Sequence, residues 1–192
     1  VAIFDYDDKT GTTVEKLKKE YPESQVVGFK LDIRDKETVT NCVDEVAKKW
    51  GHIDVLVNNA GVCRLETFDE VRDFHFDTNI KGAWNVTKAV VPHMKKNECS
   101  SIVNLSSVTG PMVADSGEVA YATTKAALVG FSKALAVELV GSNIRSNAIL
   151  PGYIMTPMVE NMSKLSDPAN PTAVIDGIAA AIPMKRLGTI TE

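Results

Sequence analysis

Cysteine and histidine are both scarce in this sequence, and their spacing fits neither disulfide bonds nor a metal site. Cys42, Cys63 and Cys99 are odd in number and widely spaced, which argues against a disulfide framework and against a zinc site. The three histidines form no ligand pattern. We therefore expect no bound metal, and free thiols favour a reducing, cytoplasmic location.

Clusters of positive charge and long apolar runs are also missing. The net charge is −4, and lysines occur only in isolated pairs, so nucleic acid is not an expected partner. No apolar stretch approaches the length of a membrane span, so no membrane association is expected. A chain of 192 residues with 44% hydrophobic and 24% charged residues instead indicates one globular domain over residues 1–192.

Apolar runs and segments of helical period alternate along the chain. The predicted strands are 1–4, 25–31, 53–57, 101–105 and 144–150, and the predicted helices are 12–21, 35–50, 68–96 and 119–140. We expect Asp35 to cap the second helix, Gly51 to end it, and the third helical region to break near Asp77 and Thr78. Regular alternation predicts an α/β fold, a doubly wound parallel sheet between two layers of helices.

A glycine-rich turn of the Gly-x-Gly-x-x-Gly type is absent, although a dinucleotide-binding Rossmann sheet carries it after its first strand. In the strand order 3-2-1-4-5-6, residues 1–4 would form the second strand, and the first would lie between them and 53–57. Without it, inner backbone groups would lack partners at about 1–3 kcal/mol each. We therefore expect the sequence to be a fragment that lacks the first strand.

Tyr121 and Lys125 are four residues apart in a predicted helix, and Ser107 precedes Tyr121 by fourteen residues. Positions i and i+4 share one helix face, so the Lys125 ammonium can lie near the Tyr121 hydroxyl. A nearby cation favours phenolate, so we expect Lys125 to lower the pKa of Tyr121. The pair therefore predicts a general acid/base. No His/Asp partner accompanies Ser107, which favours a hydrogen-bond donor over a nucleophile.

Four further motifs surround this trio in the sequence. They are Asn58-Asn59-Ala60-Gly61, Asn79-Ile80-Lys81-Gly82, Ser106-Ser107-Val108-Thr109-Gly110, and Pro151-Gly152 with Thr156-Pro157. Together with Tyr-x-x-x-Lys, in this order, they resemble the short-chain dehydrogenase/reductase family over the whole chain, including its bacterial, hydroxysteroid dehydrogenase-like members. The resemblance also implies a further helix and a final strand beyond residue 192.

The resemblance implies a catalytic set and a nicotinamide cofactor. Asn79, Ser107, Tyr121 and Lys125 match the family's catalytic residues, with Asn79 holding a water in a proton relay and Lys125 also binding the nicotinamide ribose. An acidic residue at the end of the second strand accepts ribose hydroxyls and repels a 2′-phosphate, so Asp5 favours NAD over NADP. The other matched cofactor positions are Asp32, Ile33, Asn58, Gly61, Pro151, Gly152, Ile154 and Thr156.

The expected reaction interconverts a secondary alcohol and a ketone by hydride transfer, with Tyr121 as the acid/base. Residues 155–185 contain Met158, Met162 and Leu165 between Pro and Gly residues, which indicates a mobile substrate lid. An apolar lid slightly favours a hydrophobic or steroid-like ketone over a sugar or polyol.

Two other classes of function stay open. A 3-oxoacyl-carrier-protein reductase would use the same four residues, but it usually takes NADPH and needs a basic patch. A non-catalytic NAD-sensing scaffold would keep the cleft but lose the catalytic set. The resemblance also implies a homo-oligomer, a tetramer or dimer, built through the helices at 68–96 and 119–140.

Overall fold

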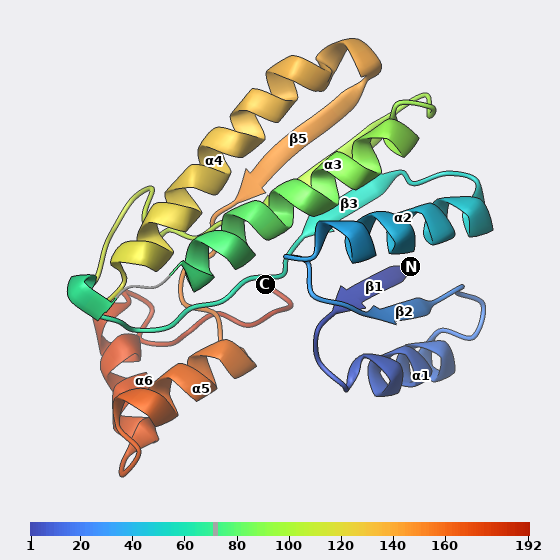
Figure 1. Ribbon diagram of the computed structural model, residues 1–192. Helices are drawn as coiled ribbons and strands as arrows, with labels where there is room; N and C mark the ends of the chain where they lie inside the picture. Colours follow the sequence, from blue (N-terminus) through green and yellow to red (C-terminus); the bar gives the residue numbers. More distant parts are fainter. Residues whose placement is uncertain (71–72) are drawn as a thin grey trace.

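The computed structural model describes residues 1–70 and 73–192. Five strands alternate with six α-helices (Figure 1). The order is β1 (Ala2–Asp5), α1 (Thr10–Glu20), β2 (Val27–Lys30), α2 (Lys36–Trp50), β3 (Val55–Asn58), α3 (Ala83–Met94), β4 (Ser100–Leu105), α4 (Val119–Leu139), β5 (Ile144–Ile149), α5 (Pro157–Ser166) and α6 (Pro171–Ala181). The predicted strands and the helices predicted at 12–21, 35–50 and 119–140 are present, and the predicted parallel α/β architecture is confirmed.

The strands form two parallel sheets. In the first, β1 pairs with β2, and in the second the order is β3-β4-β5. A cavity of about 1110 Å³ lies between them, lined along its length by β1 and β3. This is the place at which the sequence predicted a missing central strand. The carboxyl ends of β3, β4 and β5 meet at one edge of the larger sheet, because all three strands are parallel.

Local sequence explains where the helices begin and end. Asp35 accepts hydrogen bonds from the backbone N–H groups of Glu37 and Thr38 and so caps α2, as predicted. Gly51 ends that helix in the left-handed region, at φ 80°, which a residue without Cβ adopts freely. In Figure 1, α2, α3 and α4 lie along one face of the strands, while α1 lies on the other side of β1 and β2.

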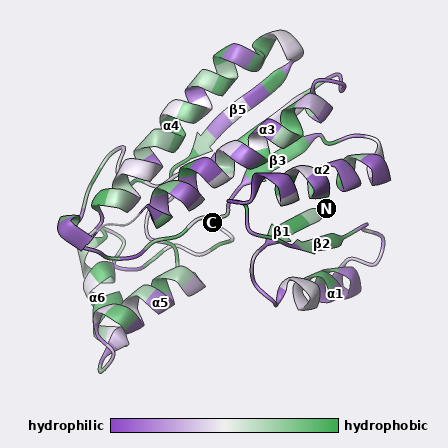
Figure 2. Cartoon of the chain, viewed as in Figure 1, coloured by the Kyte–Doolittle hydropathy of each residue, from purple (hydrophilic) through white to green (hydrophobic). Residues whose placement is uncertain are grey.

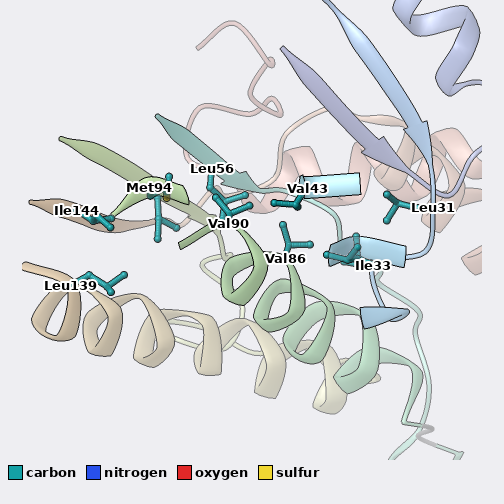
Figure 3. Packing of buried hydrophobic residues seen from close by; sticks show 11 residues of the cluster. Leu31, Ile33, Val43, Leu56, Val86, Val90, Met94, Leu139 and Ile144 are labelled. Atoms are coloured by element: carbon teal, nitrogen blue, oxygen red, sulfur yellow. The ribbon is translucent and has the colours of Figure 1, made fainter. Parts of the chain in front are cut away.

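The core lies between α2, α3 and α4 and the strands they cover (Figure 3). Met94 and Ile102 are fully buried, and Leu56 and Ile144 are at most 8% exposed. The β3 strand is mainly hydrophobic, whereas β5 and α2 are hydrophilic over much of their length (Figure 2). Val55 and Val57 on the opposite face of β3 remain more than half exposed, so the described residues cover this strand on one face only.

The region predicted as one helix over residues 68–96 with a break near Asp77 and Thr78 has a different form. It contains a short 3-10 helix, η1 (Phe68–Glu70), then a π-helix, η2 (Phe76–Gly82), which runs without interruption into α3. Residues 71–72 of the predicted helix lie outside the described residues. The predicted break is wrong, because the wider π turn absorbs the irregularity that the sequence suggested.

The segment predicted as a lid, residues 155–185, forms the paired helices α5 and α6. Both begin with a proline at the first turn, where its missing N–H costs nothing. Figure 1 shows the pair standing away from the β1–β2 sheet. Their packing on each other leaves several apolar side chains exposed, including Met158 and Leu165. Among the described residues, none of the helices is long and apolar enough to cross a membrane.

Candidate functional site

Lys125 and Asn79 meet beside Gly61 at the carboxyl end of β3. A Cβ built at Gly61 would lie 3.3 Å from Asn79 Oδ1 and 3.5 Å from Lys125 Nζ, so glycine leaves room for both side chains. Lys125 Nζ donates a hydrogen bond to the carbonyl of Leu105, at the end of β4, at 2.8 Å. Residues from three separate motifs of the sequence are therefore in contact at one edge of the sheet.

Asn79 lies in the π-helix η2 and is 1% exposed. Its Oδ1 accepts from the Val62 N–H at 2.8 Å, and its Nδ2 donates to the Val62 carbonyl and to Thr124 Oγ1, both at 3.0 Å. The side chain thus ties the segment after β3 to α4. Both amide hydrogens are used by the protein, and the predicted role of Asn79 in a water relay stays a prediction.

Ser106 and Ser107 differ in what their hydroxyl groups bond. Ser106 Oγ donates to the carbonyl of Lys125 at 2.6 Å, which holds the loop after β4 against α4. Ser107 Oγ instead accepts from the Thr109 N–H at 3.1 Å, and the hydroxyl also hydrogen-bonds with Tyr121. Ser107 therefore lies beside Tyr121, and its role as the donor to a substrate oxygen stays a prediction. Ser106 is a structural residue that the sequence did not distinguish.

Tyr121 is near both Ser107 and Lys125, but its acidity differs from the expected one. Lys125 Nζ lies 5.6 Å from the centre of the tyrosine ring. Burial raises the pKa of Tyr121 to about 12, while a hydrogen bond with Ser107 acts in the opposite direction and Cys63 and Glu118 add to the rise. The expected lowering of this pKa is wrong for this structure, because loss of solvent outweighs the other effects.

Burial also changes the acidity of the lysine. It lowers the pKa of Lys125 to about 8, because a protonated amine is poorly solvated in the interior. The carbonyl of Leu105 is its hydrogen-bond partner. Near neutral pH the lysine is therefore mostly protonated and the tyrosine is a neutral phenol, which is the form that donates a proton.

The residues predicted to bind a dinucleotide lie in different environments. Asp5 is exposed at the end of β1, and it lines the cavity between the sheets together with Ile33 and Asn58. Ile33 packs into the core against Gly82, where a Cβ would come within 2.4 Å of its Cδ1. Asp32 binds the guanidinium of Arg34, which lowers the pKa of Asp32 through a hydrogen bond. Asp32 is therefore not an isolated acceptor.

The Asn58 side chain connects neighbouring elements of the fold. Its Nδ2 donates to Asn104 Oδ1 of β4 and to Thr87 Oγ1 of α3, both at 2.9 Å. The residue is 9% exposed, and its amide links two strands and a helix. It shapes the base of the cleft through these contacts, since the protein already uses both amide hydrogens.

The loop after β5 carries the remaining predicted positions. The Pro151 carbonyl accepts from the Val108 N–H, so this loop lies beside the loop that holds Ser107. Ile154 forms a bridge with Gly188, and Gly152 makes no contact that a Cβ would disturb. Thr156 precedes α5 without capping it through its side chain. The loop brings these residues to the edge of the sheet where Lys125 and Tyr121 lie.

A nicotinamide dinucleotide fits this set of residues. Gly61 leaves space where a side chain would press on Lys125, and Lys125 offers a donor. Asp5 offers an exposed carboxylate at the end of a parallel strand, with Oδ1 accepting from the Asp7 N–H at 3.0 Å. Ligands of open α/β sheets bind outside the carboxyl ends of the strands, where the strand order reverses. The fold and the site together define a doubly wound α/β protein of the oxidoreductase class.

Comparisons with known proteins agree with this class. A family model described as enoyl-(acyl carrier protein) reductase matches residues 1–192. The oxidoreductase UcpA of Escherichia coli (strain K12) is 56% identical over 165 residues, 84% of this chain and 63% of the relative. A 3-oxoacyl-[acyl-carrier-protein] reductase, FabG of Thermotoga maritima, is 42% identical over 168 residues, 85% of this chain and 65% of the relative. The chain belongs to the short-chain dehydrogenase/reductase family, and it spans less than two thirds of the length of these relatives.

Solved structures show the same fold. Levodione reductase superposes with a TM-score of 0.90 at 28% identity, covering 98% of this chain and 75% of the other. L-Sorbose reductase from Gluconobacter frateurii, complexed with NADPH and L-sorbose, gives 0.87 at 29% identity, covering 98% and 74%. NAD⁺-bound xylitol dehydrogenase gives 0.86 at 28% identity, covering 98% and 77%. The sorbose reductase structure contains NADPH, and the xylitol dehydrogenase structure contains NAD⁺.

One buried residue of the site was missed in the sequence. Glu118 lies three residues before Tyr121, is 7% exposed, and immediately precedes α4. A carboxylate less than one helical turn from a candidate acid/base is a signal that the sequence contained. Its burial could not be foreseen, because Glu is almost never fully buried unless it is paired.

Proposed function

We propose that the protein is an NAD(P)-dependent oxidoreductase that interconverts a secondary alcohol and a ketone. The observation that carries this proposal is the contact of Lys125 and Asn79 beside Gly61, with Tyr121 and Ser107 next to them. In oxidation, the alcohol loses a hydride from its carbinol carbon and a proton from its hydroxyl, and it becomes a ketone. A bound nicotinamide dinucleotide supplies the acceptor or donor for the hydride.

The protein's own residues handle the proton and the substrate oxygen. In reduction, the Tyr121 phenol donates its proton to the oxygen as negative charge develops there, and in oxidation the phenolate removes that proton. Ser107, which hydrogen-bonds with Tyr121, turns its hydroxyl to the same oxygen when substrate is bound and donates a hydrogen bond to it. Lys125 lies at the base of the site and provides the positive charge that steadies the phenolate.

NAD is the preferred cofactor in this proposal. Asp5 is exposed at the end of β1, and its carboxylate would accept ribose hydroxyls and repel a 2′-phosphate. Arg34 follows β2 in the sequence and is a possible partner for a 2′-phosphate, but its guanidinium forms an ion pair with Asp32. This reduces its capacity to bind a phosphate, which supports the same preference.

Calorimetric titration with NADH and, separately, with NADPH tests the proposal, followed by assays with secondary alcohols and ketones. The protein is used as its gene encodes it. We expect tighter binding of NADH and turnover that Tyr121→Phe abolishes. Failure to bind either nucleotide by a folded protein would overturn the proposal.

A 3-oxoacyl-carrier-protein reductase is the second candidate function. The 42% identity to the reductase of Thermotoga maritima favours it, while the net charge of −4 opposes docking of an acidic carrier. An assay with acetoacetyl-CoA and both reduced nucleotides distinguishes the two. Efficient NADPH-dependent reduction of this thioester would favour the second candidate.

The segment 155–185 is proposed as the substrate lid, formed by α5 and α6. Exposed Met155 and Met158 would favour a hydrophobic ketone, whereas the xylitol dehydrogenase and L-sorbose reductase relatives favour a sugar or polyol.

A homo-oligomer of two or four subunits and a cytoplasmic location complete the proposal. The three free cysteines are consistent with a reducing compartment.

A further inference from the structure

The Glu118 carboxyl is buried beside the candidate acid/base and is incompletely bonded. Only 7% of the residue is exposed, and its Oε2 atom is buried without a hydrogen-bond partner among residues 1–70 and 73–192. The side chain does not cap α4, although it stands at the capping position. A buried carboxyl oxygen without a partner is costly, so an arrangement of this kind needs a reason in function.

The surroundings of Glu118 come from the ends of three parallel strands. Burial and the neighbouring Asp115 raise the pKa of Glu118, while a hydrogen bond with Thr109, which follows β4, lowers it. The Glu118 charge in turn helps to raise the pKa of Cys63 after β3 and that of Tyr153 after β5. It also acts on Tyr121, three residues further along the chain and on the same side of the helix. The carboxyl therefore faces the edge of the sheet where the Tyr121 chemistry takes place.

The backbone around Glu118 is held in place from two sides. The Gly117 carbonyl accepts from the Glu66 N–H at 2.9 Å, and the Tyr153 hydroxyl donates to Asp115 Oδ2 at 3.1 Å. Gly117 itself has φ 81°, a conformation that glycine adopts without strain. A carboxyl group fixed in this way can select between ligands, because it cannot turn away to find solvent.

We propose that Glu118 is a specificity-determining residue that binds a second hydroxyl group of the substrate, next to the carbon that reacts at Tyr121. The inference rests on the proposed function and names its substrate class: vicinal diols, polyols and the matching hydroxyketones. A carboxylate is an acceptor, and a substrate hydroxyl is the donor that Oε2 lacks. A simple hydrophobic alcohol offers no such donor, and it would leave the buried oxygen unpaired in the complex.

The experiment compares pairs of alcohols that differ by one hydroxyl group, with the full-length protein and saturating NAD⁺. The pairs are 2,3-butanediol with 2-butanol, and 1,2-cyclohexanediol with cyclohexanol. We expect kcat/KM to favour each diol by about 10-fold or more, as a hydrogen bond to a charged group implies. Glu118→Leu should lower kcat/KM for each diol more than for the matching simple alcohol, and so remove this preference.

A second variant and a control separate the effect of the Glu118 charge from other effects of the substitution. Glu118→Gln keeps the size of the side chain but provides a weaker, neutral acceptor, so the preference for the diol should fall several-fold. Glu138→Gln removes one charge from an exposed position of the same helix and should leave the preference unchanged. If Glu118→Leu does not fold, as judged by circular dichroism, Glu118→Gln alone decides.

The outcomes separate this inference from the proposed function. Turnover of the simple alcohols with no preference for diols, or equal losses on both members of a pair in the Glu118 variants, would overturn the role of Glu118 and leave the oxidoreductase standing. A folded protein that binds neither nucleotide and oxidises none of the four alcohols would overturn both.

Discussion

Tyr121 is the residue on which the chemistry depends most. Replacing it with Phe removes only the hydroxyl, so we expect turnover to fall by about 10²–10⁴-fold or more while NADH binding is kept. Steady-state kinetics and calorimetry on the same preparations check the two parts. Unchanged turnover would show that another group moves the proton. Tyr6→Phe, an exposed tyrosine outside the site, is the matched control.

The pH dependence of the reaction follows from the same hydroxyl. With a pKa near 12, Tyr121 is protonated at neutral pH, and its basic form increases about tenfold per pH unit below that value. We expect kcat/KM for alcohol oxidation to rise with pH up to about pH 8 and to level off above it, where Lys125 loses the charge that steadies the phenolate, and that for reduction to stay nearly flat below about pH 8. A plateau in oxidation near neutral pH would contradict this, and would mean that the Tyr121 pKa is lowered in the working complex.

Asp5 carries the prediction on cofactor choice. Asp5→Asn removes the charge but keeps the size, so repulsion of the 2′-phosphate should weaken. We expect the ratio of the NADPH and NADH dissociation constants to fall by about 10-fold, which corresponds to about 1.4 kcal/mol. Calorimetric titration measures it, with Asp8→Asn as the control. An unchanged ratio would remove Asp5 from the cofactor site.

At the scale of the elements, the loop after β4 depends on glycine where it touches α4. Gly110 has φ 101°, and a Cβ there would meet the Ala122 carbonyl oxygen at 2.1 Å. We expect Gly110→Ala to lower the free energy of unfolding by about 2 kcal/mol or more, because strain and a backbone clash add. It should also displace Ser107 and reduce turnover. Urea unfolding and kinetics measure the two effects.

Gly130 within α4 provides the opposite case. It has no atom within 4 Å of a built Cβ and lies in the middle of the helix. Gly130→Ala should therefore raise the free energy of unfolding by about 0.5–1 kcal/mol, since alanine is the better helix former. The two substitutions are chemically identical. If both substitutions changed the free energy of unfolding in the same direction, the close approach of Gly110 to α4 would not be the cause of the destabilisation.

At the scale of the molecule, α3 and α4 present an exposed aromatic surface. Trp84 is 55% exposed, and its ring lies 5.4 Å from that of Phe131, with Val137 exposed further along α4. These features support the proposed homo-oligomer, which would cover them. We expect Trp84→Glu to shift the protein toward the monomer in sedimentation velocity, while Lys88→Gln on the same helix, which also lowers the net charge by one, serves as the charge-matched control. A wild-type protein that is monomeric at micromolar concentration would contradict the proposal.

The order of strands and helices, the caps at Asp35 and Gly51, and the positions of the motifs followed from the sequence alone. Periodicity and capping are local, so residues a few positions apart determine them. The same locality explains why the gap between β1 and β3 was predicted: each strand could be recognised separately and placed in the known order of a doubly wound sheet.

Only the tertiary structure decided what each side chain does in the site. The Ser106 hydroxyl donates to the Lys125 carbonyl, and the Asn79 amide is hydrogen-bonded to the Val62 backbone. Glu118 is buried with one carboxyl oxygen unpaired among the described residues. The tertiary structure also reversed the expected direction of the Tyr121 pKa shift. These properties depend on solvent exclusion and on contacts between residues more than ten positions apart, and neither is encoded in the spacing of a motif.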